Sequence, residues 1–489
     1  MGADLFSIGR SSLQTSKKSL ATTSHNIANS NTEGYSRQRV TTSTNPVVKS
    51  GNNVFGTGVN VQSVKRTHDK LVEKKLNTSL SNHEYNQQRT TELSKVEEIF
   101  NEINSDGMNK IMNRFFNTFR ELSNQPENEV VRTLVRDNAN IVVKDFKRIS
   151  EDITNVKQQI EAQLTNTVED VNVLAESIAN LNVEITRIET GGGETGDLRD
   201  QRDSAVRQLS ELFETHTYED GKGQYVVNIV GAGSLVAGSS VNKLVASSTG
   251  EDGKGSYDGE GRTEIFWASK MSSPMTNKIT KGKVGALLET RNNEIMIARN
   301  SLDELAHGLV HATNAIHRRG FVNKPIPTDQ NGNVINSPNL GQITGINFFK
   351  EPLDMSEASR NIELSENVKS DLNNIATGLA PNSPGDNRIA IAISKLQHEK
   401  ILGSGSKTFE ENYLQSVGKI GLATSKAKIS SEQSGGILAQ AKSIKERISG
   451  VSIDEETTNM VKYQQAYDAS AKMIKAADEM FDSVLGMMR

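Results

Sequence analysis

Three histidines could form a metal site, because two of them have the spacing of a zinc-binding helix. His307 and His311 stand four residues apart in HGLVH, and His317 follows. Residues four apart share one face of a helix, and zinc proteases combine this spacing with a glutamate that acts as general base. Here Gly308 occupies the position of that glutamate, and His311 lies beside Leu309 in a helix with a core pattern. We therefore expect no metal site at these histidines.

Two further motifs resemble chemical sites. DQRD at residues 200–203 places carboxylates and a guanidinium on one helical turn, and we interpret it as an ion-pair cluster that faces solvent or another subunit. TDQNGNVINSPNL resembles a calcium loop at Asp329, Asn331 and Asn333, but Leu340 stands where the closing glutamate is needed. The chain also has no phosphate-binding loop and no nucleophile elbow. We therefore predict that it is not an enzyme and uses no catalytic residue, metal or cofactor.

The composition limits the class of protein further. Of the 489 residues, 35% are apolar and 5% aromatic, which favours thin domains with small cores. The net charge of −4 argues against a dedicated nucleic-acid-binding protein. The absence of cysteine excludes disulfides, and fits a reducing compartment or an export route that avoids them. MGADLFSIGRSSL lacks the apolar core of a conventional signal peptide, so any export would use another route. No apolar run approaches the roughly 18 residues needed to span a bilayer, so we expect no membrane insertion.

Both ends of the chain carry seven-residue repeats of large apolar residues, which are typical of coiled-coil helices. Neither segment contains a second element that would cover its seam, and an isolated helix needs packing to persist. We therefore predict that the two ends come together and pack against neighbouring subunits; the alternative is that each seam is the core face of an ordinary helical domain. The N-terminal seam consists of Phe6, Leu13, Leu20 and Ile27, and the C-terminal seam of Ile453, Met460, Tyr467, Ile474, Phe481 and Met488.

The segment NIANSNTEGYSRQ, residues 26–38, follows the first helical pattern and predicts a corner. Asparagine and glycine tolerate left-handed backbone conformations, so they can end the helix here. Residues 40–65 then show the alternation and glycine turns of extended chain. The predicted corner motif comprises Asn26, Asn29, Asn31, Thr32, Gly34 and Tyr35, with Tyr35 as the anchor.

The middle of the chain predicts a mainly α fold with a β-rich insertion (α+β), built from terminal coiled-coil helices, an elongated helical bundle and a small outer β domain. Long helical repeats fill residues 67–190, strand patterns fill residues 216–280, and helical repeats return at residue 284. Residues 321–385 hold six of the nine prolines.

We assign residues 1–39 and 450–489 to the terminal helices, residues 40–215, 284–320 and 386–449 to the helical domain, and residues 216–283 to the β-rich domain. Residues 321–385 form an irregular or extended segment, for which we consider the β-rich domain as packing partner.

NIANSNTEGYSRQRV resembles the signature of the flagellar rod and hook axial family, and its SRQ extension resembles the branch of that family found between hook and filament. Three further stretches are similar to that branch: GDLRDQRDSAVRQLSELF, NAIHRRGF and most of the sequence from Ser449 onward. The resemblance implies a structural protein of the hook–filament junction, with terminal helices lining the inner tube and the β-rich domain facing outward.

The resemblance also implies partners and a location. The partners would be other copies in a ring or helical array, the hook protein, a second junction protein on the filament side, and an export chaperone at the C-terminal helix. The protein would leave the cytoplasm unfolded through the flagellar type III apparatus and act outside the cell, with no nucleic acid and no membrane insertion. The alternative that we keep is a secreted coiled-coil adhesin or effector that uses the same export route.

Overall fold

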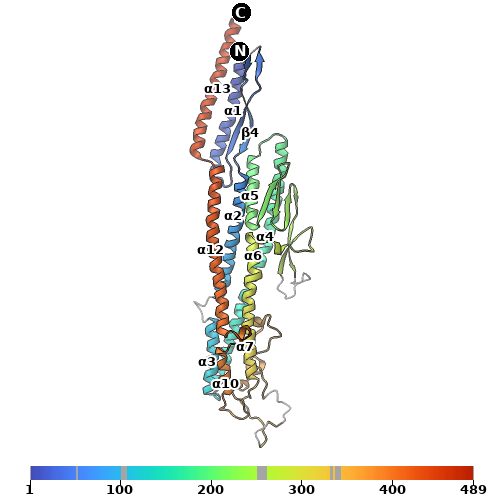
Figure 1. The fold of residues 1–489 in the computed structure, drawn as a ribbon, viewed down its shortest axis with the longest axis vertical. Coiled ribbons are helices and arrows are strands. Elements are labelled where there is room, and N and C mark those ends of the chain that lie inside the picture. The colour runs from blue at the N-terminus through green and yellow to red at the C-terminus, as the bar shows by residue number, and fades with distance from the viewer. Residues whose placement is uncertain are drawn as a thin grey trace. The chain divides into compact units, whose positions relative to one another are not determined.

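The computed structural model describes residues 2–50, 53–100, 107–249, 262–330, 334–335 and 343–487. They form two compact units: the first comprises residues 1–85, 164–285 and 432–489, and the second residues 86–163 and 286–431 (Figure 1). The predicted fold class, mainly α with a β-rich insertion, is confirmed. Long helices that contribute residues to both units are α2 (Lys70–Ile99), α4 (Glu129–Thr190) and α12 (Phe409–Ser449).

The remaining helices of the first unit lie at the two ends of the chain and after α4. α1 and α13 lie side by side (Figure 1). They run antiparallel, because Ser12 contacts Ser470 (Oγ to Oγ, 2.7 Å) whereas Asn26 bonds to Glu456 (3.0 Å). The two ends of the chain therefore meet, as the seams predicted. The bounds are α1 (Gly2–Ala28), α5 (Gly196–Leu212), α6 (Gly282–Glu289) and α13 (Ile453–Met487).

The strands of the first unit form small antiparallel sheets. β1 pairs with β4, with a register shift between Thr41 and Thr42, and β2 pairs with β3. β5, β6, β7 and β8 form one sheet in that order, and β9 pairs with β10. The bounds are β1 (Gln38–Thr44), β2 (Val48–Ser50), β3 (Asn53–Phe55), β4 (Val59–Arg66), β5 (Thr215–Glu219), β6 (Tyr225–Ile229), β7 (Gly233–Ala237), β8 (Ser240–Val241), β9 (Leu244–Thr249) and β10 (Arg262–Trp267).

Two asparagines of α4 hold these sheets against the helix. The Asn182 side chain is fully buried; its Nδ2 donates to the carbonyls of Tyr225 (3.0 Å) and Gly238 (2.8 Å), and its Oδ1 accepts from the Tyr225 N–H (2.9 Å). Asn172 bonds in the same way to the backbone N–H and carbonyl of Leu244. Because a buried amide needs partners for all its polar atoms, these contacts fix the position of β6 and β9 on α4.

The long helix α4 shows the change of phase that its sequence predicted. Its seven-residue rows begin as buried core, but Leu174 and Leu181 are only half-buried. A straight helix turns slightly relative to a seven-residue repeat, so one row cannot stay buried over 62 residues. The buried row at the start of α4 is Phe146, Ile153, Ile160 and Thr167, and the row that replaces it is Val171, Ile178 and Ile185.

The second unit is built around clustered aromatic rings. Phe115 lies 5.2 Å from both Phe116 and Phe119, and 6.0 Å from Phe348, between ring centroids. These side chains are at most 1% exposed, so they form an aromatic cluster within the core, which the low aromatic content made hard to foresee. The additional helices are α3 (Met108–Asn124), a π-helix (Thr290–Ile295), α7 (Met296–His317), α8 (Ala358–Asn361), α9 (Glu366–Ser370), α10 (Arg388–Lys395) and α11 (Leu402–Gly405).

The proline-rich segment, residues 321–385, is fastened to the second unit by buried polar side chains. Asn314 of α7 accepts from the backbone N–H of Phe348 and of Phe349, both at 2.9 Å. Arg132 of α4 donates to the carbonyls of Leu372 (3.2 Å) and Ile375 (2.7 Å). The sequence suggested the β-rich region as a partner for this segment; the contacts described here are with α7 and α4.

Two smaller features bear on the sequence predictions. Thr408 and Glu411 form the capping box that their spacing predicted, since the Thr408 N–H donates to Glu411 (2.9 Å) and the Glu411 N–H donates to Thr408 (3.1 Å). Among the described helices, none has the length and apolar character required to cross a bilayer.

His317 ties α7 to the proline-rich segment as a neutral side chain. It is fully buried, its Nδ1 lies 2.7 Å from the carbonyl of Ile346, and its Nε2 accepts from the N–H of Ala376 at 2.9 Å. Burial lowers the pKa of His317 from 6.5 to about 4. The unfolded chain therefore binds a proton at a higher pH than the native state does.

We predict that the free energy of unfolding loses on the order of 3 kcal/mol as the pH falls from 6.5 to 4, because protonation favours the unfolded chain in that window. Denaturant unfolding of His317→Gln should lack this component of the pH dependence. His398→Gln is the matched control, since His398 is exposed. The prediction is wrong if both variants keep the pH dependence of the original chain.

Candidate functional site

The corner after α1 is organised by one buried amide, that of Asn26, which is 1% exposed. Its Nδ2 donates to the Gln38 carbonyl (2.9 Å) and to Glu456 Oε2 (3.0 Å). Its Oδ1 accepts from the Tyr35 hydroxyl (2.8 Å) and from the Gln38 N–H (3.0 Å). A primary amide has two donor hydrogens and two acceptor lone pairs, so every one is used. Asn26 therefore joins α1, the turn, β1 and α13 at one point.

The residues between Asn26 and β1 form a compact turn. Asn29 Nδ2 donates to the His25 carbonyl (3.0 Å), and Thr32 Oγ1 donates to Asn29 Oδ1 (3.2 Å). Gly34 has a φ of +84°, and a Cβ there would lie 2.8 Å from Arg207 Nη2. Glycine is favoured here by the backbone conformation, whereas the end of the flexible Arg207 side chain could move aside. Of the six predicted corner residues, Asn31 is the exposed one for which the structure shows no side-chain role.

Tyr35 lies where the predicted anchor should be. Besides donating to Asn26, its ring meets the ring of His25 edge-on, with centroids 5.6 Å apart. Burial, followed by the nearby carboxylates of Asp197, Asp200 and Glu456, raises the pKa of the Tyr35 hydroxyl above its ordinary value. The hydroxyl therefore stays protonated and remains a donor at any physiological pH.

Arg37 connects the corner to α13 a second time. Its N–H donates to the carbonyl of Ser449 (2.8 Å), and its guanidinium binds Glu455 (2.8 and 2.9 Å) and Glu456 (2.7 Å). The hydrogen bond from Arg37 lowers the pKa of the exposed Glu455 carboxyl. Two carboxylates in the first turn of α13 also face the positive end of the helix dipole. The start of α13 is thus positioned by side chains and backbone that lie more than 400 residues away in the sequence.

DQRD, residues 200–203, is not the solvent-facing or subunit-facing cluster that its composition indicated. Asp200 and Asp203 are 7% and 3% exposed. Both form ion pairs with the Arg66 guanidinium, at 2.7 and 2.6 Å. Asp200 also accepts a hydrogen bond from the Ser36 N–H (2.8 Å). The prediction was wrong because spacing on one helical turn does not reveal which element covers that turn. Here β4 and the corner cover it, and the cluster belongs to the fold of this chain.

The electrostatics of this cluster keep it charged although it is buried. Burial alone would raise the pKa of Asp203, but Arg66, His68 and a hydrogen bond from Tyr225 lower it overall. The Tyr225 hydroxyl donates to Asp203 at 2.7 Å. Arg202, which stands between the two aspartates in the sequence, is fully buried, and its guanidinium carbon lies 3.5 Å from the centroid of the Tyr225 ring. The ion pair between Arg66 and the two aspartates is costly to break because it is buried, so it holds β4 and α5 together beside the corner.

The predicted seams are only partly covered in the single chain. The most deeply buried residues along α1 are small, such as Gly9, Ser16 and Thr23, and on α13 they include Ser470 and Ala477. Small residues let two helices approach closely, which leaves their larger neighbours at the edge of the contact. Leu13, Leu20, Ile27, Met460, Tyr467 and Ile474 are half-buried, Phe6, Ile453 and Phe481 are exposed, and Met488 lies outside the described residues.

A second seam on α13 was missed by the sequence analysis. Met473, Met480 and Met487 recur every seven residues and are 40%, 46% and 83% exposed. They stand about 100° around the helix from the seam that faces α1. The sequence alone could have revealed this seam, because small residues and the methionines follow one another at alternating steps of three and four residues, which is the spacing of one helix face. The second seam consists of Ala466, Ala469, Met473, Ala476, Met480, Ser483 and Met487.

The three histidines do not converge on one point. The rings of His307 and His311 lie 4.1 Å apart, and His311 Nδ1 lies 3.3 Å from Glu351, whereas both nitrogens of His317 bond to backbone. Within the ranges that the structure describes, no group of three or more possible ligands gathers around a metal-sized site. Residues 331–333 of the calcium-like loop lie outside those ranges.

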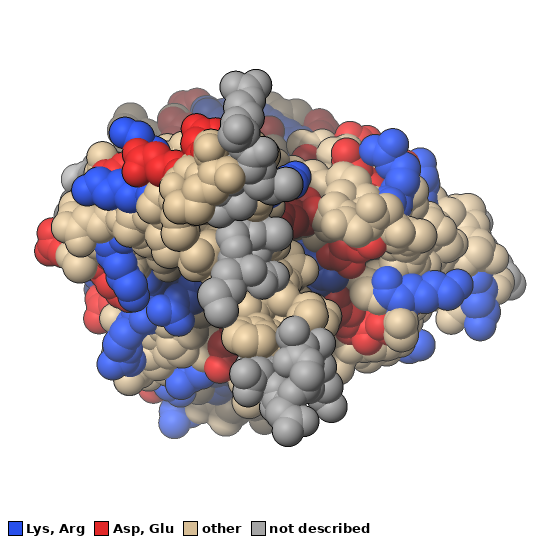
Figure 2. All heavy atoms as spheres, turned by 90° about the horizontal axis from the view of Figure 1, so that it is seen from above, with Lys and Arg blue, Asp and Glu red and all other residues tan. Residues whose placement is uncertain are grey.

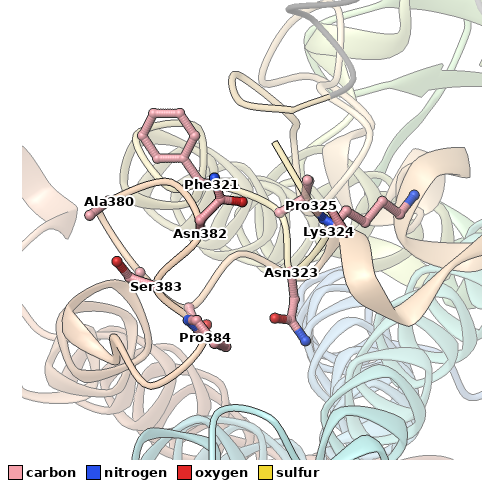
Figure 3. Close-up of a pocket in the computed structure, with 11 residues that line it drawn as sticks. Phe321, Asn323, Lys324, Pro325, Ala380, Asn382, Ser383 and Pro384 are labelled. Carbon is pink, nitrogen blue, oxygen red and sulfur yellow. The ribbon is translucent and has the colours of Figure 1, made fainter. Parts of the chain in front are cut away.

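A pocket of about 320 Å³ in the second unit lies between residues 321–325 and 377–384 (Figure 3). Lys324 is the one charged side chain that lines it, and it is bound to Asp371 at 2.7 Å. Asn382 holds the pocket together, since its Oδ1 accepts from the Ile326 N–H at 2.8 Å and its Nδ2 donates to the Ile326 carbonyl at 2.6 Å. The lining holds no histidine or carboxylate that could act as a base beside a nucleophile.

The charged surface shows no single sign. In the view of Figure 2, Lys and Arg side chains are interspersed with Asp and Glu side chains. A nucleic-acid-binding face would gather the cations. The face seen in Figure 2 therefore gives no indication of a nucleic-acid-binding surface.

Comparison with known proteins relates the chain to flagellar families. A family described as "Flagellar hook-associated protein FlgK helical domain" matches residues 93–334. The families "Flagella basal body rod protein" and "Flagellar basal body rod FlgEFG protein C-terminal" match residues 6–35 and 447–487, which are α1 with most of the corner and α13. The two rod families thus match the two segments that the Asn26 amide joins.

Relatives that match almost the whole chain are named flagellar hook-associated protein 1. Flagellar hook-associated protein 1 of Bacillus subtilis (strain 168) is 28% identical over 98% of this chain and 97% of its own. The proteins of that name from Salmonella typhimurium and Escherichia coli are each 24% identical over 99% of this chain and 100% of their own. The solved structure of the flagellar hook junction protein FlgK from Burkholderia pseudomallei has a similar fold, with a TM-score of 0.63 at 16% identity, over 77% of this chain and 100% of that one.

Fold, corner and terminal helices together define a structural protein of the flagellar axis. Its role is structural, at the junction between hook and filament, and its partners are other axial proteins of the flagellum. The chain belongs to the family of flagellar hook-associated protein 1.

We predict that Asn26→Ala costs on the order of 2–3 kcal/mol of stability in the first unit, because it removes one hydrogen bond to the buried Glu456 carboxylate and leaves the part-buried backbone N–H and carbonyl of Gln38 without the partner that Asn26 supplies. Hydrogen exchange at the end of α1 and the start of α13 should accelerate accordingly. Asn31→Ala, in the same turn but exposed, should change stability by less than about 0.5 kcal/mol. Equal effects of the two variants would contradict the central position of Asn26.

Proposed function

We propose that this chain joins hook to filament by packing its terminal helices between subunits of a ring or helical array. The observation that supports this most directly is the second seam of α13, with methionines at seven-residue spacing that the same chain leaves exposed. Methionine suits such a contact, since its flexible side chain adapts to partners that are not identical. A junction subunit has this requirement, because its neighbours differ on its two sides.

The energetics favour ordering through assembly. Phe481, Leu485 and the three methionines of the second seam are 40–83% exposed, and burying them fully would contribute on the order of 4–8 kcal/mol gross per subunit. Fixing these side chains costs a comparable amount of conformational entropy. The contact therefore becomes favourable when several neighbours add their parts, which fits a protein that remains unassembled until it reaches the junction.

The same seam gives a reason for the proposed partners and route. Before export, the apolar stripe of α13 would need a cover in the cytoplasm, and we propose an export chaperone at this helix. After export through the flagellar type III apparatus, the hook protein, other copies and a second junction protein on the filament side would replace that cover outside the cell. No step of this role uses catalysis, a metal or a cofactor.

We predict that Met473→Glu with Met480→Glu abolishes filament attachment while the protein is still secreted, because buried carboxylates would be unpaired in the subunit contact. Electron microscopy of hooks and immunoblots of the culture medium would measure both, in cells where this chain is the sole copy. Val461→Glu with Lys475→Glu is the matched control, since both residues are exposed on the same helix and neither lies three or four residues from a member of either seam. Normal junctions in the methionine variant would refute the proposed contact.

Removal of residues 450–489 separates the junction role from a secreted adhesin or effector. If the chain is a junction protein, cells that make it without α13 should have hooks that carry no filament, and the truncated chain should remain unassembled. A secreted adhesin or effector domain should retain its binding or activity, because its site would lie in the remaining residues. Filaments that attach normally in this deletion would argue for the second class.

A further inference from the structure

The first unit carries an open groove between α4 and α5 that its own chain does not fill. The groove has a volume of about 630 Å³. Val173, Leu174, Leu181 and Ala205 form its apolar lining, and exposed polar residues such as Ser177 and Gln201 also line it. Leu174 and Leu181 stand seven residues apart, about 10.5 Å along the helix. A groove of this kind accepts the side chains of one further helix.

The same unit carries an apolar stripe on α12 that is also left open. Ile437 and Ile448 are 53% and 38% exposed, and Ile444 between them is half-buried. Positions separated by seven and four residues share one helix face. A Cβ built at Gly436 would meet nothing within 4 Å, so another helix can approach closely there. Leu414, Leu422 and Ile429, in the part of α12 that belongs to the second unit, are also more than half exposed, but their spacing turns them away from the face of Ile437.

The two surfaces match in spacing and in charge. Ile437 and Ile444 have the same seven-residue separation as the two leucines of the groove. Residues 164–190 of α4 contain five carboxylates and one cation, Arg187, which lies 3.8 Å from Glu184; Glu176 and Glu184 line the groove. Glu176 is already bound by Lys243 (2.6 Å). Residues 433–449 of α12 carry three cations and one anion, with exposed Arg447 beside the stripe.

We propose that the stripe on α12 of one subunit docks into the α4–α5 groove of a second copy of this chain. This inference rests on the proposed function, since it requires assembled subunits, and it adds a side-to-side contact outside the terminal helices. Both surfaces are open in the single chain, so neither covers the other within one molecule. A stripe and a different groove form a head-to-tail contact, which is the kind that extends into rings or helical arrays. The opposite charges set the choice of partner.

Disulfide mapping tests the contact directly, because the chain has no cysteine of its own. Ser177→Cys lies at the middle of the groove, and Gln440→Cys beside the middle of the stripe, so the pair serves for either helix direction. The two variants are expressed together in cells whose filaments remain attached, and isolated hooks are oxidised. We expect a disulfide-linked dimer of this chain, which requires the two cysteines to approach within about 4 Å between Cβ atoms.

The matched control replaces Gln440→Cys by Ala439→Cys, which is exposed but about 160° from the stripe. The docking contact predicts about tenfold less dimer for this control pair, and none for either variant expressed alone, because the geometry of a disulfide is restrictive. If either variant fails to enter the junction, the pair Gln201→Cys with Ile437→Cys repeats the test.

Filaments that stay attached while neither pair gives a dimer, or gives no more than the control, overturn the docking contact and leave the proposed function standing. Cross-linking of Ser177→Cys to another axial protein instead of to this chain also overturns it. Cells that keep their filaments when this gene is deleted would overturn the proposed function itself, so the two failures are distinguishable.

Discussion

The structure of the first unit depends on the complete use of one buried amide. Asn26 satisfies a carboxylate of α13, both backbone groups of Gln38 and the Tyr35 hydroxyl, and each of these would be costly to leave buried without a partner. The direction in which the chain leaves α1, and the place where α13 begins, are thereby set by the same four hydrogen bonds.

The buried ions behind the corner serve the same purpose. Arg66 is held by two aspartates of α5, one of which also receives the Ser36 N–H, so the turn, β4 and α5 share one charge cluster. Such a cluster contributes less to stability than apolar residues of equal volume, but it permits only one geometry. In the proposed assembly, where the chain ends pack between subunits, a single geometry would fix the angle at which they enter.

The terminal helices themselves follow a division between small and large residues. Gly9, Ser470 and Ala477 allow α1 and α13 to approach closely, as the 2.9 Å separation between a Cβ built at Gly9 and Ile474 Cγ1 shows. The cost is that the larger side chains lie at the margin of the contact. The small residues of the two helices are therefore buried between them, whereas the large ones remain partly exposed at the edges. The second seam of α13 lies outside this contact and stays exposed as well.

Spacing and residue type determined much of this protein. The seven-residue repeats predicted both terminal helices, the asparagines and glycine predicted where α1 ends, and Thr408 with Glu411 predicted the start of α12, because these features depend on neighbours within one or two turns. Only the tertiary structure decided that Asn26 meets Glu456, that DQRD is buried under β4, and which seam of α13 faces α1. Those outcomes join residues far apart in the sequence, and a local pattern shows that a polar group needs a partner without showing which distant segment supplies it.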